Sequence, residues 1–378
     1  MKEFSMRTKI YMGESSIEAI KEIPMNRVFI ICDPFMVQSK KIELVTDILE
    51  EKNIPFEVFS EVVPDPTIDV VTGAVYKITD FDADTVIALG GGSAIDTAKS
   101  VCKVNNKMGL TKVSLIAIPT TSGTGSEVTS FSVISDPETK SKFPIVDEDM
   151  IPDIAVLDST LTMSVPAKIT ADTGMDVLTH AFEALVSTNA NDFSDAYAHM
   201  AIKLVFKYLE TAVKHGDDEQ ARTHMHNASC MAGIAFNSAS LGICHSMAHV
   251  LGGYFHIPHG RSNAMLLPHV IEYNARHERN VENTALSKYA DAGRMLGFGT
   301  VSDITTVKSL VRHVKMLMKR IGISPYVNEM VEMDKYSEAV EDMARRALVD
   351  KCTLTNPKEP SVEDIKEIYG MLVKNWNK

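Results

Sequence analysis

The first 160 residues alternate short β-rich runs with amphipathic stretches, and this alternation restricts the possible folds more than any other feature of the chain. Four apolar runs are predicted to be strands, at 27–33, 56–62, 84–90 and 113–119. The stretches between them have helical periodicity, at 39–52, 69–81 and 94–104. Strands that alternate with helices pair in parallel through right-handed crossovers. The pattern therefore predicts an α/β domain over residues 1–165, with two or three further short strands between residues 129 and 157.

The second part of the chain has a different pattern. From about residue 165 onward, long stretches with helical periodicity continue as far as 361–376. No strong strand run interrupts them, so residues 166–378 are predicted to form an all-helical domain. The 378 residues suffice for two domains with substantial cores, at roughly 150 residues per domain. Pro166 lies near the expected junction.

Charge and composition exclude several classes of function. The net charge of −12 argues against a nucleic-acid partner, because phosphate binding needs a basic surface. No apolar run reaches the roughly 18 residues that a membrane span needs, and MKEFSMRTKIYMGESS lacks the apolar segment of a secretory signal. The five cysteines are scattered without a CxxC pair, which fits a reducing compartment. A cytoplasmic protein that binds neither nucleic acid nor membranes is therefore expected.

The stretch TVIALGGGSAIDTAK predicts a strand, a glycine turn and a helix. Gly90, Gly91 and Gly92 allow the backbone to turn sharply and to approach a ligand closely. The helix that begins near Ser93 would direct free N–H groups and the positive end of its dipole toward the turn, which suits a pyrophosphate. A tight turn without a ligand is the alternative.

This turn differs from the common dinucleotide fingerprint GxGxxG. The third glycine position holds another residue, and the best candidate for the ribose-binding acid, Asp33, precedes the glycines instead of following them by about 20 residues. A loop with five hydroxyl side chains, PTTSGTGSE at 119–127, follows another predicted strand. We expect this loop to line the same crevice at the carboxyl ends of parallel strands, although a plain loop is the alternative. The order indicates a nucleotide domain of another lineage, or no nucleotide domain.

Two pairs of polar residues occur at helical spacing in apolar surroundings. Asp176 and His180 lie four residues apart, as do His245 and His249, and His259 follows ten residues further on. Residues four apart share a helix face, and each buried polar group would cost about 1–3 kcal/mol if it were left unpaired. A divalent ion bound by Asp176, His180, His245 and His259 would satisfy them together, and this donor set suits Fe(II), Zn, Co or Mn. A hydrogen-bonded polar core without a metal is the alternative.

Four motifs together resemble the iron-containing (group III) alcohol dehydrogenases: GGGSAIDTAK, PTTSGTGSEVT, TGMDVLTHAFEA and CHSMAHVLGGYFHIPHGRSNAMLLPHV. The resemblance spans almost the whole chain, as far as TNPKEPSVEDI. Within the family, VFIICDPF, PDPTI, VISDP and MHNASCMAGIAF most resemble the propanol dehydrogenases of propanediol-utilising bacteria. The resemblance implies a dehydroquinate-synthase-like architecture, with an N-terminal α/β dinucleotide-binding domain, an all-helical C-terminal domain and the metal between them.

The resemblance also implies roles for individual residues. Asp176, His180, His245 and His259 match the family's metal ligands. His249 matches an extra histidine near the substrate, either a proton relay or only a hydrogen-bonding neighbour of the ligands. The implied cofactor-binding residues are Asp33, Gly91, Gly92, Ser93, Asp96, Thr120, Thr121, Thr124 and Lys142. Phe131 and Phe236 fall where family members line the alcohol pocket, with Cys352 near them, and ordinary core packing is the alternative for both rings.

The implied activity is hydride transfer between NAD(H) and a short-chain primary alcohol or aldehyde, with Fe(II), Zn or another divalent metal. NAD is expected over NADP because a carboxylate at Asp33 would accept hydrogen bonds from the ribose and repel a 2′-phosphate, unless Asp33 merely caps the turn. The alternatives are a polyol dehydrogenase of the glycerol or 1,3-propanediol type, a dehydroquinate-synthase-like lyase, and a non-catalytic metal- or nucleotide-binding protein. A homodimer or larger homo-oligomer is expected, and the resemblance extends to proteins of bacterial microcompartments.

Overall fold

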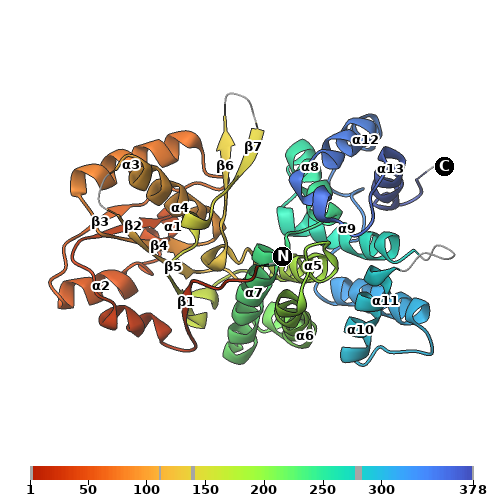
Figure 1. Ribbon diagram of the computed structural model, residues 1–378, viewed down its shortest axis with the longest axis horizontal. Coiled ribbons are helices and arrows are strands. Elements are labelled where there is room, and N and C mark those ends of the chain that lie inside the picture. The colour runs from red at the N-terminus through yellow and green to blue at the C-terminus, as the bar shows by residue number, and fades with distance from the viewer. Residues whose placement is uncertain (1–2, 110–111, 138–140, 277–282, 377–378) are drawn as a thin grey trace. The chain divides into compact units, whose positions relative to one another are not determined.

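The computed structural model describes residues 3–109, 112–137, 141–276 and 283–376. The chain divides into two compact units (Figure 1). The first, which we call the α/β unit, comprises Ser5–Val165, and the second, the helical unit, comprises Pro166–Lys378 together with Met1–Phe4. The parallel sheet of the α/β unit and the helices of the second unit confirm the predicted fold class.

The α/β unit is built on a six-stranded sheet in the order β1-β8-β5-β4-β2-β3, in which all neighbours are parallel. Its strands are β1 (Lys9–Met12), β2 (Val28–Cys32), β3 (Phe56–Phe59), β4 (Thr85–Gly90), β5 (Ser114–Pro119) and β8 (Ile154–Leu157). Strands β6 (Phe131–Asp136) and β7 (Ser141–Val146) form a separate antiparallel pair (Figure 1). The sequence prediction omits β1, because this strand has only four residues and none of them is buried.

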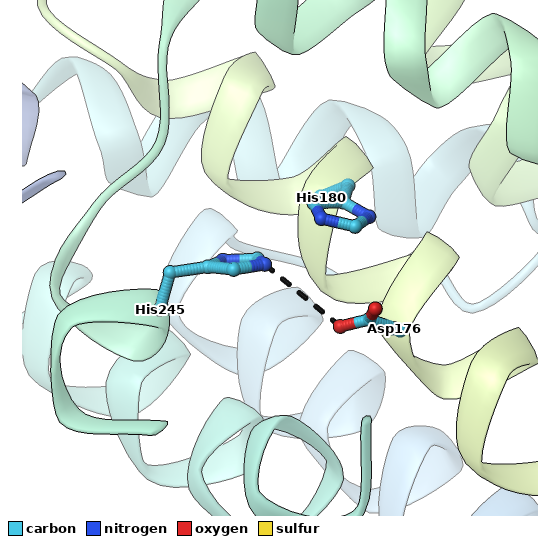
Figure 2. A group of neighbouring side chains, drawn as sticks. All are labelled: Asp176, His180 and His245. Carbon is cyan, nitrogen blue, oxygen red and sulfur yellow. Dashed lines mark ion pairs between the residues drawn. The ribbon is translucent and has the colours of Figure 1, made fainter. Parts of the chain in front are cut away.

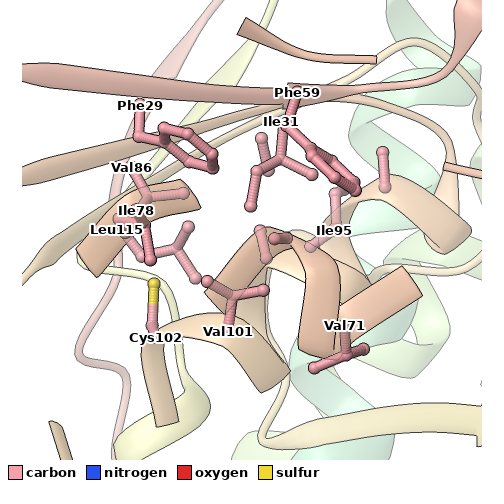
Figure 3. Close-up of a cluster of buried hydrophobic side chains, with 14 of the residues drawn as sticks. Phe29, Ile31, Phe59, Val71, Ile78, Val86, Ile95, Val101, Cys102 and Leu115 are labelled. Atoms are coloured by element: carbon pink, nitrogen blue, oxygen red, sulfur yellow. The ribbon is translucent and has the colours of Figure 1, made fainter. Parts of the chain in front are cut away.

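Helices cover both faces of the sheet, because alternate residues of a strand point to opposite faces. On one face, Phe29 and Ile31 pack with Val86 against α3 and α4 (Figure 3). On the other face, Ile30 and Ile87 pack against a short 3-10 helix, η1, and α2. The helices of this unit are α1 (Pro34–Gln38), α2 (Glu43–Glu51), α3 (Ile68–Phe81) and α4 (Gly92–Lys107), and its 3-10 helices are η1 (Ser16–Glu22), η2 (Ser126–Val128), η3 (Glu148–Met150) and η4 (Ser159–Thr162). Burial on both faces explains why β2 and β4 are continuous apolar runs.

The helix predicted at 39–52 is shorter in the structure, and a separate short helix precedes the predicted range. Helix α1 ends at Gln38, and α2 begins only at Glu43. Lys40 between them adopts a positive φ of 59°, which a continuous helix of L-residues does not accommodate.

The carboxyl ends of β5, β4 and β2 form the functional edge of the sheet. These strands are adjacent and parallel, and the register pairs Cys32 with Leu89 and Gly90 with Pro119. Strand β2 lies between β3 and β4 in the sheet. The chain passes from β2 to β3 on one side of β2, and the next strand, β4, is placed on the opposite side of β2. Open α/β sheets bind ligands at such a switch point. The fold therefore brings Asp33, the glycine turn and the threonine-rich loop to one edge.

The helical unit is arranged around α5, in which every residue from Gly174 to Val186 is buried. Its helices are α5 (Ala167–Val186), α6 (Asp192–Lys214), α7 (Glu219–Ala239), α8 (Ile243–Phe255), α9 (His259–Asn274), α10 (Thr284–Met295), α11 (Asp303–Arg320), α12 (Met333–Leu348) and α13 (Val362–Met371), with the 3-10 helix η5 (Lys351–Thr355). The described residues of this unit contain no strand. Among the helices that the structure describes, none combines the length and apolar character required to cross a membrane.

Candidate functional site

Three helices of the helical unit supply the predicted metal ligands. Helix α5 carries Asp176, His180 and Glu183 on one face, because these residues are four and three positions apart. Helix α8 carries His245, and α9 begins at His259. Asp176, His180 and His245 are buried, whereas the His259 side chain is 40% exposed.

Gly260 explains how α9 approaches α5 so closely. A Cβ atom at this position would lie 2.2 Å from the backbone oxygen of Asp172. Any larger residue would therefore push the start of α9, and His259 with it, away from α5. Arg261 holds the same contact by donating from Nε to Asp172 Oδ1 at 2.5 Å.

Three of the four predicted ligands, Asp176, His180 and His245, lie close together in the structure (Figure 2). Asp176, His180 and His245 each offer one ligand atom, and these atoms lie within 4.8 Å of one another. His245 Nε2 lies 3.8 Å from Asp176 Oδ1, and His259 Nε2 lies 3.6 Å from the same oxygen. The rings of His180 and His245 stack with centroids 4.5 Å apart. This arrangement is compatible with one small ion held by Asp176, His180 and His245, whereas His259 lies near Asp176 but outside the group of mutually close ligand atoms. The role of all four residues as ligands stays a prediction.

The chemistry of the cluster fits a divalent ion. His245 Nδ1 donates to Glu183 Oε2 at 2.5 Å, so the lone pair lies on Nε2. This Nε2 atom is buried and has no hydrogen-bond partner among the described residues. Burial also lowers the pKa of His245 well below its ordinary value, so the imidazole is neutral, as ligation requires. Burial raises the pKa of Asp176, because enclosure disfavours the charged form of the carboxyl group.

Two buried residues that sequence reasoning missed hold the ligands in place. Glu183 accepts from the Cys244 backbone N–H with Oε1 at 2.6 Å while Oε2 binds His245. Asn263 donates to Asp176 Oδ1 at 2.7 Å and lies 3.1 Å from His259 Nε2. A signal for both existed in the sequence, because Glu183 follows Asp176 by seven residues and Asn263 follows His259 by four, which are same-face spacings.

His249 lies beside the cluster at a more exposed position. Its ring stacks on His259 with centroids 5.3 Å apart, and its side chain is 43% exposed. Nδ1 lies 3.0 Å from Asp350 Oδ2. Burial opposes ionisation of Asp350, but the hydrogen bond and charge of His249 lower the pKa of this carboxyl to about 2. The sequence gives no sign of this partner, because 101 positions separate the two residues.

The residues predicted to line an alcohol pocket belong to different units. Phe236 is 6% exposed and stacks on the ring of His180, with centroids 4.6 Å apart. Cys352 is half-buried in η5, and its backbone N–H donates to Asp350 Oδ1 at 2.8 Å. Phe131 is half-buried at the start of β6 in the α/β unit. The structure therefore gives Phe236 a contact with a predicted ligand, and the pocket itself stays a prediction.

The glycine turn and the threonine-rich loop pack directly against each other. A Cβ atom on Gly92 would lie 2.8 Å from Thr124 Cγ2, and one on Gly91 would lie 3.3 Å from Thr121 Oγ1. The Thr120 backbone N–H donates to the oxygen of Gly90 at 3.0 Å. Helix α4 begins at Gly92, close to the predicted start near Ser93, so Ser93 lies in its first turn. These contacts assemble a backbone-lined turn at a helix N-terminus, which suits a phosphate group.

Helix α4 holds the end of this loop through buried polar side chains. Lys99 is fully buried, and its Nζ donates to Ser126 Oγ, Thr129 Oγ1 and the Phe131 backbone oxygen at 2.8, 3.1 and 2.8 Å. Asp96 accepts from Ser126 Oγ and from the Val133 backbone N–H at 2.7 and 3.0 Å. Asp96, predicted to bind the cofactor, thus uses both carboxylate oxygens within the protein. Lys142, also predicted there, lies on β7, and its side chain is outside the described part of the structure.

Asp33 divides its two oxygens between two neighbours. Oδ1 accepts from the backbone N–H groups of Phe35 and Met36 at 2.9 and 3.2 Å and so caps α1. Oδ2 faces the glycine turn, 3.3 Å from where a Cβ on Gly90 would lie. The alternative that Asp33 merely caps the turn therefore applies to Oδ1. Oδ2 lies at the edge of the sheet where the ribose of the cofactor is expected.

Comparisons with known proteins agree with this geometry. A family model described as iron-containing alcohol dehydrogenase matches residues 7–159, and one described as Fe-containing alcohol dehydrogenase family, C-terminal, matches residues 170–373. The 1-propanol dehydrogenase PduQ of Citrobacter freundii is 42% identical over 374 residues, covering 99% of this chain and 100% of that protein. The NADPH-dependent butanol dehydrogenase of Clostridium saccharobutylicum is 36% identical, covering 98% and 97%.

Solved structures give the same result. A 1,3-propanediol oxidoreductase matches with a TM-score of 0.90 and 31% identity, covering 98% of this chain and 99% of that one. The sulfoacetaldehyde reductase of Bifidobacterium kashiwanohense, solved in complex with NAD⁺, matches with a TM-score of 0.88 and 28% identity over 99% of both chains. The resemblance proposed from the four motifs, including the likeness to propanol dehydrogenases, is confirmed. The chain belongs to the iron-containing alcohol dehydrogenase family.

Proposed function

We propose that this dehydrogenase transfers hydride between NAD(H) and a short-chain primary alcohol or aldehyde, with Fe(II) held by Asp176, His180, His245 and His259. The observation that carries the proposal is the buried His245 Nε2, which has no hydrogen-bond partner among the described residues and faces a buried carboxylate. Zinc or another divalent ion also suits one oxygen and three imidazole donors. Residues 1–165 would bind the dinucleotide, and residues 166–378 would bind the metal and the substrate.

Each group then has a defined task. When bound, the ion supplies Lewis-acid polarisation of an alcohol or carbonyl oxygen, and the nicotinamide carries the hydride. The turn formed by Gly91, Gly92 and Ser93 offers backbone N–H groups to the pyrophosphate, with Thr120, Thr121 and Thr124 beside it. His249, oriented by Asp350 and partly exposed, carries a proton between the substrate oxygen and solvent.

The relatives support a small, unbranched substrate. Their names specify 1-propanol and butanol, and the solved structure of a 1,3-propanediol oxidoreductase supports a polyol as the second candidate. Phe236 beside His180 and Phe131 in the α/β unit are proposed to limit the length of the chain that is accepted, together with Cys352. Propanal, acetaldehyde and butanal are the substrates expected to be reduced most efficiently.

An NADH absorbance assay with a panel of aldehydes and polyols tests the proposal. We expect metal-dependent oxidation of NADH with propanal and lower catalytic efficiency with glycerol or 1,3-propanediol in the reverse direction. Phe131→Ala should extend the accepted chain length. If that variant loses only stability, Phe131 is an ordinary core residue, and if iron-loaded protein oxidises no NADH with any aldehyde, the proposed function is wrong.

Assembly and location are proposed from the family likeness alone. A homodimer or larger homo-oligomer in the cytoplasm is expected, and the family resemblance extends this expectation to a bacterial microcompartment. Light scattering after size-exclusion chromatography tests the first expectation. Fractionation of the native host tests the second.

A further inference from the structure

A second group of ligand-type side chains lies in the helical unit beside the Asp176 cluster. His249, Asp350 and Cys352 each offer one ligand atom, and these three atoms lie within 4.8 Å of one another. The His249 and Asp350 side chains are 43% and 23% exposed, and Cys352 is half-buried. An ion from solvent can therefore reach the group without unfolding the protein.

The carboxylate of this group is already oriented as metal-binding carboxylates usually are. Asp350 Oδ1 accepts from the Cys352 backbone N–H at 2.8 Å and from Ser246 Oγ at 3.2 Å. Oδ2 is directed at His249 Nδ1, 3.0 Å away. Asp350 also caps the start of η5, which fixes the position of Cys352 two residues later. Protein hydrogen bonds to one oxygen commonly hold a ligating carboxylate in this way.

The donor atoms of the two clusters differ in chemical type. Asp176, His180, His245 and His259 offer one oxygen and three nitrogens, whereas the second group offers a nitrogen, an oxygen and a sulfur. Thiolate donors favour Zn²⁺ and similar thiophilic ions over harder ones. We propose that His249, Asp350 and Cys352 form a second metal site, which takes a thiophilic divalent ion such as Zn²⁺.

Binding at this site is balanced by proton movement. The ion forms bonds to Asp350 Oδ2, His249 Nδ1 and Cys352 Sγ. The Cys352 S–H bond breaks and its proton goes to solvent, while the His249 proton leaves Nδ1 and the ring becomes the Nε2–H tautomer. Burial raises the pKa of Cys352 well above its ordinary value, so the ion must displace a proton and binding should strengthen as pH rises.

Occupation of the second site would also restrain His249. With Nδ1 bound to the ion, the imidazole could no longer alternate between its two neutral tautomers, and proton relay through the ring would stop. Zn²⁺ should therefore inhibit the enzyme reversibly without removing iron. This consequence rests on the proposed role of His249, whereas the binding site itself does not.

Cobalt provides a probe that distinguishes the two sites. Co²⁺ bound to a thiolate absorbs through sulfur-to-metal charge transfer, and the Asp176 cluster contains no sulfur, so this absorption reports the second site alone. We expect anaerobic titration of the iron-loaded protein with Co²⁺ to give this band, saturating at one ion per chain with release of protons to solvent. Zn²⁺ should abolish the band by competition. This readout does not depend on catalytic activity.

Variants locate the band. Cys352→Ser should abolish it, whereas Cys102→Ser, which changes a buried thiol of the α/β unit, should retain it. His249→Gln and Asp350→Asn should each lower the affinity for Co²⁺ by roughly 10–100-fold or more. Circular dichroism establishes that each variant is folded, and His249→Gln, at an exposed position, serves if Cys352→Ser does not fold. No thiolate band in the unmodified protein, a band that persists in Cys352→Ser, or unchanged affinity in His249→Gln would overturn the proposal.

Discussion

Each unit of the molecule contains a buried polar cluster, and the two clusters differ in how completely the protein satisfies them. In the α/β unit, Lys99 donates three hydrogen bonds to three protein oxygens, and both oxygens of Asp96 accept protein hydrogen bonds. An ammonium group has three N–H donors, so Lys99 is fully satisfied. We call this the closed cluster.

The cluster around Asp176 in the helical unit is open by the same measure. The buried Nε2 of His245 has no hydrogen-bond partner among the described residues, although Glu183 satisfies the other ring nitrogen. Burial raises the pKa of Asp176 and lowers that of His245. The His245 ring is therefore neutral, and the lone pair of its Nε2 lies beside an enclosed carboxyl group. Between these two clusters, the unpaired His245 Nε2 that faces a buried carboxyl group distinguishes the proposed ligand site from the cluster whose polar groups satisfy one another.

The largest effect is expected for a ligand of the open cluster. His259→Ala removes one of four proposed donors, and we expect both metal content and activity to fall by more than the roughly 10–100-fold of a change behind the ligands. Elemental analysis and the NADH assay measure the two quantities. A chelator should lower the metal content and the activity of the unmodified enzyme in the same way. If the rate of NADH oxidation is unchanged by both the substitution and the chelator, the cluster binds no catalytic metal.

Much of the fold and part of the open cluster could be predicted from the sequence. The alternating pattern gave the parallel sheet, because strands covered on both faces are continuous apolar runs such as VFIIC. Asp176 with His180 could be recognised because a four-residue spacing puts both on one helix face. The family motifs then assigned Asp176, His180, His245 and His259 to one metal site. Residue spacing alone does not show that these residues, which come from separate helices, lie together.

The rest depended on contacts between distant segments. Asp350 contacts His249, which is 101 residues away in the sequence, and Lys99 donates to the backbone oxygen of Phe131, which is 32 residues away. No periodicity within a helix indicates such partners. Sequence reasoning also could not state whether Asp96 faces a ligand or the protein, because that depends on where Ser126 and Val133 lie.

A residue behind the open cluster should have the next largest effect. Glu183→Gln keeps the shape of the side chain but weakens the bond that orients His245, so the affinity for Fe²⁺ should fall by roughly 10–100-fold. Equilibrium dialysis against a competing chelator measures this affinity. Glu127→Gln is the matched control, because Glu127 is equally buried, at 2% exposed, but lies in the α/β unit. Equal affinities in the two variants would contradict the role of Glu183.

The closed cluster should respond in stability rather than metal binding. Lys99→Met leaves Ser126 Oγ, Thr129 Oγ1 and the Phe131 oxygen without their shared donor, and each unsatisfied buried group costs about 1–3 kcal/mol. We expect a lower free energy of unfolding in urea, weaker NADH binding and unchanged metal content.

Lys107 provides the control for this change. It is exposed near the end of the same helix, and Lys107→Met should alter stability by no more than about 0.5 kcal/mol. If Lys99→Met is as stable as Lys107→Met, or if it loses metal, the distinction between the closed and open clusters does not hold.

The smallest effect is expected for Asp33. One of its carboxylate oxygens accepts hydrogen bonds from the protein, and the other faces the glycine turn. Oδ1 caps α1, while Oδ2 lies at the glycine turn, where it would repel the 2′-phosphate of NADP. Two unit charges about 4 Å apart repel by roughly 4 kcal/mol at an effective dielectric constant near 20. Solvent and salt weaken this repulsion, yet about 1.4 kcal/mol already gives a tenfold preference. We therefore expect higher catalytic efficiency with NADH than with NADPH.

Two substitutions separate the functions of the two Asp33 oxygens. Asp33→Asn keeps an oxygen that can accept from Phe35 and Met36 but removes the charge, so it should narrow the preference for NADH by about tenfold at nearly unchanged stability. Asp33→Gly should narrow the preference as well and also lose a few tenths of a kcal/mol, because the cap is removed. Catalytic efficiencies with both cofactors and urea unfolding curves measure these effects. If only Asp33→Gly changes the preference, the effect arises from the cap and not from the charge. Equal efficiencies with both cofactors in the unmodified enzyme would remove Asp33 from cofactor selection altogether.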